Sequence, residues 1–434
     1  MWKMNNRLVI YRKILIGCTF FSVCILFFFL YMESFNRIPS NIHIFEGQEQ
    51  SIRFHVPVQG KLYSDDFEDS AVQAGDFTKS NIPENSIHID LQKDVVLYSE
   101  KNGSYTMECK LFGFLPMKTV KVSVIDDRNL IPAGIPIGIY MKTDGVLIIG
   151  TGTVKGMDGM EYEPAQYLLK SGDYITSVDG LEINSKAELI AQLKESGKEE
   201  VVLGVRRDGD EFRVKVHAVE TTPGEYKLGI WVRDNTQGIG TLTYLKEDGE
   251  FGALGHGIND ADTSDLMELY GGTLYQTEIL SIVKGKTGTP GELTGVINYQ
   301  EECVLGEITD NTSGGIFGIS NEELKQEVGT EEMPVGLKQN IKVGPATILS
   351  TVNGVRREYD IRITKVDFTP ESVNKGIVFQ VTDPELLDLT GGIVQGMSGS
   401  PILQDGKIVG AVTHVFVQDS TKGFGIFIEN MLEH

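Results

Sequence analysis

A glycine-rich string near the C-terminal end of the sequence carries the strongest chemical signal. Residues Gly396–Pro401 read Gly-Met-Ser-Gly-Ser-Pro, and the glycines allow a sharp turn that exposes the Oγ of Ser398. Backbone N–H groups near such a turn can stabilise the oxyanion that forms when a serine attacks a carbonyl. The string therefore predicts Ser398 as a nucleophile for acyl transfer. Ser400 is the rival nucleophile in the same string.

A serine nucleophile needs a base, and one of the seven histidines suits that role. His256 stands between Gly255 and Gly257, where the backbone is open and few side chains could bury the imidazole. This setting is typical of a cleft residue, so we expect His256 to be the base. His414 follows the hairpin turn after Ser398. We expect it to lie in a strand, and it is the second choice.

A carboxylate should orient the imidazole of the base. Asp383 is the first choice, and Asp310 is the runner-up. Asp260 and Asp262, which lie beside His256, come next. Spacing alone does not separate these four aspartates.

The block that carries these residues, about Gly229–His434, is rich in glycine and in short apolar alternations. This pattern is typical of an all-β barrel pair or sandwich. The strands that close over Asp405-Gly406 resemble those that follow the nucleophile of trypsin-like peptidases. That resemblance implies an oxyanion hole formed by the backbone N–H groups of Gly396 and Ser398.

A different pattern precedes the glycine-rich block. Two extended runs, at 135–140 and 145–150, lead to an expected short helix at 164–169 and a strand at 174–178. Ser185 can cap a helix over 186–195, with Glu188 completing a capping box, and a hairpin follows at 201–216. The ordered set is similar to a bacterial PDZ domain.

The PDZ resemblance implies a function in binding. Such domains bind extended peptides by adding a strand to an exposed sheet edge. The resemblance places the peptide-binding N–H groups around Ile137, Gly138 and Ile139. The alternative is a small α/β domain whose groove is filled or unused.

Residues 14–32 contain no charged side chain, and a helix of about 20 such residues spans a bilayer. Four cations precede this run: Lys3, Arg7, Arg12 and Lys13. The positive-inside rule then puts the N-terminus in the cytoplasm and the rest of the chain outside. No small-residue cleavage site ends the run, so we expect an uncleaved transmembrane anchor.

The 434 residues leave room for several domains. With Lys+Arg at 39 and Asp+Glu at 61, the net charge is −22, which argues against a nucleic acid partner. None of the four cysteines has metal-ligand spacing. The predicted organisation is a cytoplasmic tip and anchor (1–33), a connector and β-rich region (34–128), a PDZ domain (129–219) and a serine peptidase domain (220–434).

Two stretches, Ala253–Ile258 and Thr390–Ile402, resemble the stage IV sporulation protein B family, which comprises membrane-anchored PDZ-serine peptidases of spore-forming bacteria. The resemblance implies a triad of His256, Asp383 and Ser398 that needs no metal or cofactor, and it leaves Ser400 structural. It also implies an enzyme that acts in the space around the forespore. There it would cleave other copies of itself and a membrane-bound regulator, and so trigger a late sigma factor. The alternative is an inert, membrane-tethered scaffold that binds through its PDZ domain.

Overall fold

The computed structural model describes residues 2–64, 72–74, 87–100, 103–126, 128–197 and 199–433. These residues form two compact units. The first contains Met1–Arg128 together with Val335–Lys342 and Lys365–Glu371. The second contains Asn129–Pro334, Val343–Thr364 and Ser372–His434.

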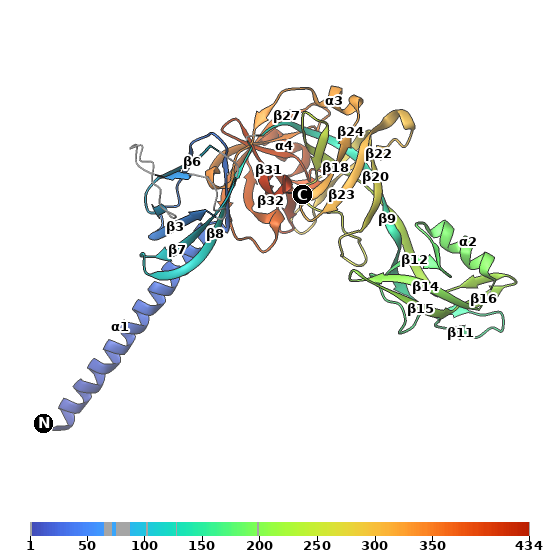
Figure 1. Ribbon diagram of the computed structural model, residues 1–434, viewed down its shortest axis with the longest axis horizontal. Coiled ribbons are helices and arrows are strands. Elements are labelled where there is room, and N and C mark those ends of the chain that lie inside the picture. Colours follow the sequence, from blue (N-terminus) through green and yellow to red (C-terminus); the bar gives the residue numbers. More distant parts are fainter. Residues whose placement is uncertain are drawn as a thin grey trace. The chain divides into compact units, whose positions relative to one another are not determined.

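The first unit begins with the long helix α1, Trp2–Arg37 (Figure 1). Its segment Val9–Arg37 is long and apolar enough to cross a membrane. Large apolar side chains such as Phe20 and Phe29 are exposed on it, so most of its apolar surface is not buried in a protein core. The expected helix over 14–32 is therefore present and extends further in both directions.

The rest of the first unit is the predicted β-rich region. One sheet has the strand order β1-β8-β7-β3-β5, and another has the order β2-β6-β4. In β7, Tyr105, Met107, Cys109 and Leu111 alternate into the core, which gives the period-two pattern of a half-buried strand. The bounds are β1 Asn41–Phe45, β2 Gln50–Ile52, β3 Val58–Ser64, β4 Val72–Ala74, β5 Ile87–Asp90, β6 Val95–Ser99, β7 Gly103–Leu111, β8 Leu115–Ile125 and the 3-10 helix η2 Lys338–Asn340.

The second unit is organised around one long strand, β9, Asn129–Thr151. It pairs along most of its length with the antiparallel strand β18, Ile230–Leu245. The runs 135–140 and 145–150, which we expected to be separate, are thus parts of a single strand. Its first part pairs with β18 and with β20, Leu269–Tyr275, both from the glycine-rich block, and its last part also pairs with β12 of the block that resembles a PDZ domain.

This second block, between β9 and β18, is a small α/β arrangement over the core of Val146, Ile175, Leu189 and Leu203. The helix α2, Lys186–Ser196, begins as expected: the Ser185 side chain accepts a hydrogen bond from Glu188 N. The Glu188 carboxylate accepts from Asn184 N. The strands are β10 Val154–Lys155, β11 Glu161–Tyr162, β12 Tyr174–Val178, β13 Leu181–Glu182, β14 Glu200–Arg207, β15 Asp210–His217, β16 Val219–Thr222 and β17 Glu225–Lys227.

The helix expected over 164–169 is absent, and that segment forms turns. Tyr167 has a φ of 61°, in the left-handed region, which a right-handed helix cannot contain. The apolar spacing that favoured a helix here serves a turn in which only Ala165 and Leu169 reach the core.

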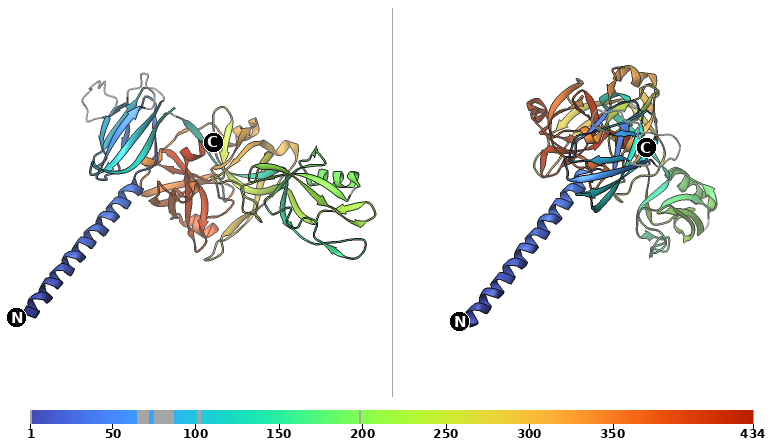
Figure 2. Two further views of the ribbon diagram at one scale, coloured as in Figure 1. Left: turned by 60° about the horizontal axis from the view of Figure 1, so that its bottom comes forward. Right: turned by 60° about the vertical axis from the view of Figure 1, so that its left-hand side comes forward.

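Two closed rings of strands make up most of the rest of the second unit. In the first ring, β9 and β18 continue through β19, β24, β23 and β20, and β20 pairs back onto β9. The second ring is a closed barrel in the order β26-β27-β28-β32-β31-β30. Its strands all follow residue 343, and Figure 2 colours this stretch of the chain from orange to deep red. The predicted fold class, mainly β with an N-terminal apolar helix and a trypsin-like domain, is confirmed.

The ring strands are β19 Glu250–Ala253, β20 Leu269–Tyr275, β23 Val304–Thr312, β24 Gly315–Ser320, β26 Gly344–Ser350, β27 Arg357–Val366, β28 Ile377–Val381, β30 Pro401–Gln404, β31 Lys407–Phe416 and β32 Asp419–Phe427. A small separate sheet has the order β21-β22-β29. The remaining elements are β21 Thr277–Val283, β22 Gly291–Ile297, β25 Met333–Pro334, β29 Val394–Gln395, α3 Glu322–Val328, α4 Pro384–Thr390, α5 Ile428–Met431, η1 Glu301–Cys303 and η3 Val373–Lys375.

Candidate active site

The loop after β19 positions His256. Leu254 and Gly255 have φ values of 68° and 70°, and this pair of left-handed residues turns the chain sharply after the strand. The turn is closed by a 2.9 Å hydrogen bond from Gly255 N to Ala253 O. Leu254 is buried, while His256 is half-buried at the end of the first ring.

The loop before β30 positions Ser398, and it is fastened to the first ring. Thr241 of β18 donates its backbone N–H to Ser398 O (2.9 Å) and its Oγ1 to Gly396 O (2.7 Å). Gly399 has a φ of 99°, and a Cβ there would lie 2.0 Å from Thr241 O. Only glycine fits such a close approach of two backbones.

His256 and Ser398 line the same pocket, which has a volume of about 810 Å³. One wall comes from the first ring and includes Ile139 and Ile239, and the other comes from the second ring and includes Thr413. The structure therefore brings together the two residues that the sequence predicts as base and nucleophile, although they come from different rings.

The hydrogen bond of His256 fixes which nitrogen carries the proton. Its Nδ1 lies 2.9 Å from Gly257 O, and because a carbonyl only accepts, Nδ1 is the protonated nitrogen. Nε2 is then left as an acceptor, as a base requires. Burial lowers the pKa of His256 below its usual value, and the hydrogen bond to Gly257 opposes that shift. The imidazole is thus neutral near pH 7.

Ser398 Oγ donates to Thr413 O at 3.1 Å. Its proton is therefore directed to a carbonyl in this structure, and a rotation of the side chain is needed to direct it to an imidazole. Catalytic hydrogen bonds commonly form fully only when substrate is bound.

The backbone of the serine loop leaves two amides available. Three others donate to carbonyls at 2.7–3.1 Å: Met397 to Val394, Gly399 to Val412 and Ser400 to Met397. Within the described residues, no acceptor is recorded for the N–H groups of Gly396 and Ser398. These are the two amides expected to form the oxyanion hole.

Asp383 lies elsewhere. It is the N-cap of α4, where its Oδ1 accepts from Leu386 N at 3.0 Å. Its Oδ2 lies 3.6 Å from Arg357 Nη2 and 3.4 Å from Asp360 N. Asp383 does not line the pocket, and Nδ1 of His256 meets a carbonyl instead of a carboxylate. The structure does not bring Asp383 to His256, so its place in a triad stays a prediction.

The other three aspartates do not line the pocket either. Asp310 is exposed on β23 and accepts from Thr309 Oγ1 at 2.7 Å. Asp260 is buried and pairs with Arg233, which also binds Asp262 at 2.8 Å. These contacts hold the segment after His256 in place and direct none of the carboxylates at the imidazole.

Asn311, for which the sequence predicted no such role, also supports the segment that follows His256. The Asn311 side chain accepts from Ile258 N at 2.9 Å and donates to Ile258 O at 3.0 Å and to Met267 O at 2.9 Å. Its amide thus holds the backbone two residues beyond His256. No local sequence pattern predicts this contact, since Asn311 lies on β23 and Ile258 lies in the loop after β19, more than fifty residues earlier in the chain.

His414, the second choice for the base, lies beside the first. The two rings are 5.1 Å apart between centroids, and both line the pocket. Burial, together with smaller contributions in the same direction from the neighbouring His256 and Lys375, lowers the pKa of His414 to about 4. His414 is part of β31, as expected, and it is a neutral wall of the pocket near pH 7.

Ser400 is fully buried and does not line the pocket, in agreement with a structural role.

The peptide-binding position predicted at Ile137, Gly138 and Ile139 is wrong. In this part of β9, one edge pairs with β18 and the other pairs with β20. Gly138 itself is paired with Ile239 and with Tyr275, so no strand can be added at either edge. Ile137 and Ile139 point into the core of the first ring.

Comparison with known families gives one match. Residues 224–432 match the family model described as SpoIVB peptidase S55. A search of curated proteins found no match for the chain. The matched residues contain His256, Asp383 and Ser398 and every strand of the two rings except β9. Members of this family are serine peptidases, which are hydrolases that cleave the peptide bonds of proteins.

Proposed function

We propose that this chain, whose residues 224–432 form a serine peptidase domain of the SpoIVB S55 family, is a membrane-anchored endopeptidase with Ser398 as nucleophile and His256 as base. One observation carries the assignment of residues: His256 and Ser398, one from each ring, line a single pocket. The tautomer of His256 is the one that a base needs.

The chemistry is acyl transfer to water. Ser398 Oγ attacks the carbonyl carbon of the scissile bond while His256 Nε2 takes its proton. The oxyanion is held by the N–H groups of Gly396 and Ser398. His256 then gives the proton to the leaving amine, and water releases the acyl group by the reverse steps.

The site suits an extended substrate. Strand β30 pairs with β31 only as far as Ala411, while β32 pairs with the other edge of β31 to Phe416. Within the described residues, no strand covers the first edge of β31 at His414–Phe416. A substrate could therefore add there as a strand and place a carbonyl at Ser398.

The anchor and the resemblance support a more specific role. We propose that α1 spans the membrane with the cations before residue 14 in the cytoplasm, which leaves the peptidase domain outside. The substrates would be other copies of the chain and a membrane-bound regulator in sporulation signalling. The block around α2 would serve as a PDZ domain, with its peptide site at an edge other than residues 137–139.

The test is cleavage of a protein substrate and of the chain itself by the full-length enzyme in detergent. Ser398→Ala should lower kcat by about 10⁶, as loss of a triad serine does. Because Ser400 does not line the pocket, Ser400→Ala should keep most of the activity. A fully active Ser398→Ala variant would refute the assignment. A wild-type chain that folds and cleaves nothing would favour the inert scaffold.

A further inference from the structure

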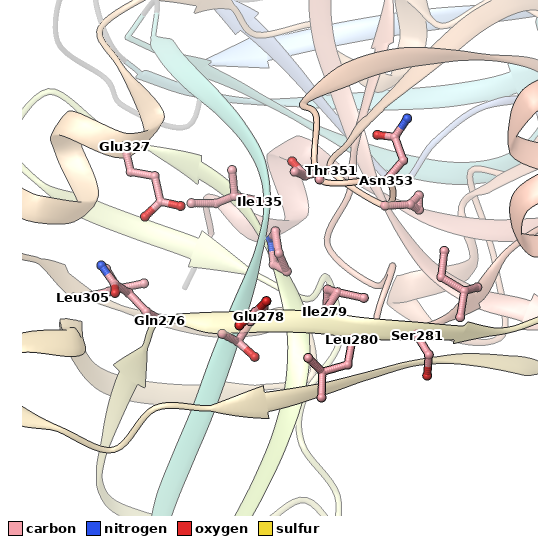
Figure 3. Close-up of a pocket in the computed structure, with 15 residues that line it drawn as sticks. Ile135, Gln276, Glu278, Ile279, Leu280, Ser281, Leu305, Glu327, Thr351 and Asn353 are labelled. Carbon is pink, nitrogen blue, oxygen red and sulfur yellow. The ribbon is translucent and has the colours of Figure 1, made fainter.

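A second hollow, of about 750 Å³, shares no lining residue with the catalytic pocket. It follows consecutive residues from Gln276 to Ile282 along β21. Figure 3 shows Glu278 and Leu280 on this strand, with Asn353 across from it and Glu327 toward one end. We call this hollow the β21 groove.

The β21 groove runs beside an open sheet edge. Strand β21 ends its three-stranded sheet, and among the described strands only β22 pairs with it. Its apolar side chains are not shielded: Leu280 is 61% exposed and Val283 is 52% exposed. Proteins usually protect such an edge with charges, proline or a covering element. An open edge beside a groove can bind an extended polypeptide by strand addition.

The charge of the groove indicates which kind of polypeptide it can bind. Glu278 and Glu327 line it, and among the residues that the structure describes no lysine or arginine does. A basic side chain bound between them would form charge-assisted hydrogen bonds. The formal net charge of the chain is −22, so of the two proposed substrates a basic segment of a different protein fits the groove better than a second copy of this chain.

The β21 groove is connected to the catalytic pocket through one sheet. Strand β22 pairs in parallel with β29, with Gly291 opposite Val394 and Glu292 opposite Gln395. Val394 and Gln395 both line the catalytic pocket, and Gly396 follows them directly. A strand added to β21 would therefore extend the sheet whose other end leads into the serine loop.

We propose that the β21 groove binds an extended, basic segment of the substrate polypeptide, away from the bond that is cleaved. This proposal rests on the proposed function, since it takes the substrate to be a polypeptide. Main-chain hydrogen bonds to β21 hold the segment, apolar residues lie against Ile279 and Ile282, and a lysine or arginine lies near Glu278 and Glu327.

Binding can be measured without catalysis. The full-length Ser398→Ala variant in detergent is titrated with a fluorescent decapeptide of alternating valine and threonine that carries one central arginine. A twin peptide carries glutamate instead. We expect the arginine peptide to bind more tightly by roughly tenfold or more, the range for a charge-assisted hydrogen bond.

Variants then locate the site. The double variant Glu278→Lys/Glu327→Lys should lose at least about tenfold in affinity for the arginine peptide. Glu323→Lys, an exposed position on the same helix α3 that does not line the groove, is the matched control and should bind as before. Wild-type enzyme whose Ser398 has been blocked by a phosphonate should also bind as before.

Four results would overturn the proposal. Equal affinity for the two peptides, or normal binding by the double variant, would show that Glu278 and Glu327 do not bind a basic side chain. Loss of binding after phosphonate treatment would place the peptide in the catalytic pocket. A changed oligomeric state of the double variant would assign the groove to a second copy. Failure of Ser398 to react would count against the proposed function alone, because the Ser398→Ala titration does not depend on it.

Discussion

The position of the proton on His256 determines whether the other ring nitrogen can accept the proton of Ser398 Oγ. A backbone carbonyl, Gly257 O, holds the Nδ1 proton, so the orienting group seen in the structure is neutral. A neutral carbonyl fixes the tautomer as a carboxylate would, but it stabilises the imidazolium of the transition state less. A carboxylate is therefore not needed to orient the ring, but it would stabilise the imidazolium.

The pH dependence of kcat/KM should reflect the lowered pKa of His256. A base works only when neutral, so activity is present above its pKa and is lost as the pH falls through it. Because burial lowers that pKa, the midpoint of the acid limb should lie below about 6.5, the ordinary histidine value. Cleavage of a peptide substrate between pH 4 and 8 measures it. A midpoint clearly above the ordinary value would mean that the ring is held by a charged partner.

Asp383→Asn separates the two roles open to this residue. Asparagine caps a helix as well as aspartate does, so α4 should be retained and the unfolding temperature should hardly change. If the carboxylate acts on His256 during catalysis, kcat should fall by roughly 10⁴. Asp310→Asn, at an exposed site, is the control and should stay active. If the Asp383→Asn enzyme were fully active and the Asp310→Asn enzyme inactive, Asp310 and not Asp383 would be the third catalytic residue.

At the scale of elements, what could be predicted from the sequence was local. The capping of α2 by Ser185 and the serine loop at Gly396–Pro401 both depend on residues that are neighbours in the chain. The error at 137–139 has the opposite origin. The second edge of β9 at residues 137–139 is covered by β20, which follows more than a hundred residues later. Apolar alternation does not indicate which strands pair.

The same limit explains why the sequence could not show that the Asp383 side chain contacts α4 and not His256 in this structure. Asp383 precedes the serine loop in the sequence, yet the turn into α4 uses its side chain as a cap. Asn311, which holds the segment after His256, becomes visible only once β23 is placed beside that segment. Local sequence and family resemblance predicted His256, Asp383 and Ser398, and only the three-dimensional structure could show their contacts.

Gly399→Ala tests the fastening of the serine loop to β18. The added Cβ would meet Thr241 O at 2.0 Å, so the loop must move and the hydrogen bond from Thr241 N to Ser398 O must weaken. We expect a loss of at least about 2 kcal/mol in the free energy of unfolding, together with a large loss of kcat.

Gly406→Ala is the matched control for that change. Gly406 also has a positive φ, of 72°, but nothing lies within 4 Å of the added Cβ. Its cost should be about 1 kcal/mol, from backbone strain alone, with kcat unchanged. Chemical denaturation and peptide cleavage measure both variants. Equal effects in the two would show that the close approach to Thr241 does not matter.

At the scale of the whole molecule, the chain combines an apolar helix, a β-rich unit and a two-ring peptidase. The first ring supplies His256 and the second supplies Ser398, so neither ring alone contains the site. The β-rich unit takes in residues 335–342 and 365–371 from the peptidase part of the sequence. The second unit is thus interrupted twice, and a domain boundary drawn once along the sequence does not describe it.

The membrane topology that we propose can be tested through α1. The cations that precede residue 14 should keep the N-terminus in the cytoplasm, so an enzyme reporter that works only after export should be active when fused after His434. Deletion of residues 1–32 should abolish reporter activity without preventing synthesis of the fusion. Reporter activity in the deleted form would show that α1 is not what directs export.

The most direct test of the central claim is the site at which a fluorophosphonate reacts. Such reagents phosphonylate a serine that is activated by a base and faces an oxyanion hole. The full-length chain in detergent should gain a single adduct, mapped by mass spectrometry to Ser398. Ser398→Ala should remove it, and His256→Ala should slow its formation by orders of magnitude. An adduct on Ser400, or a folded chain that does not react at Ser398, would contradict the account.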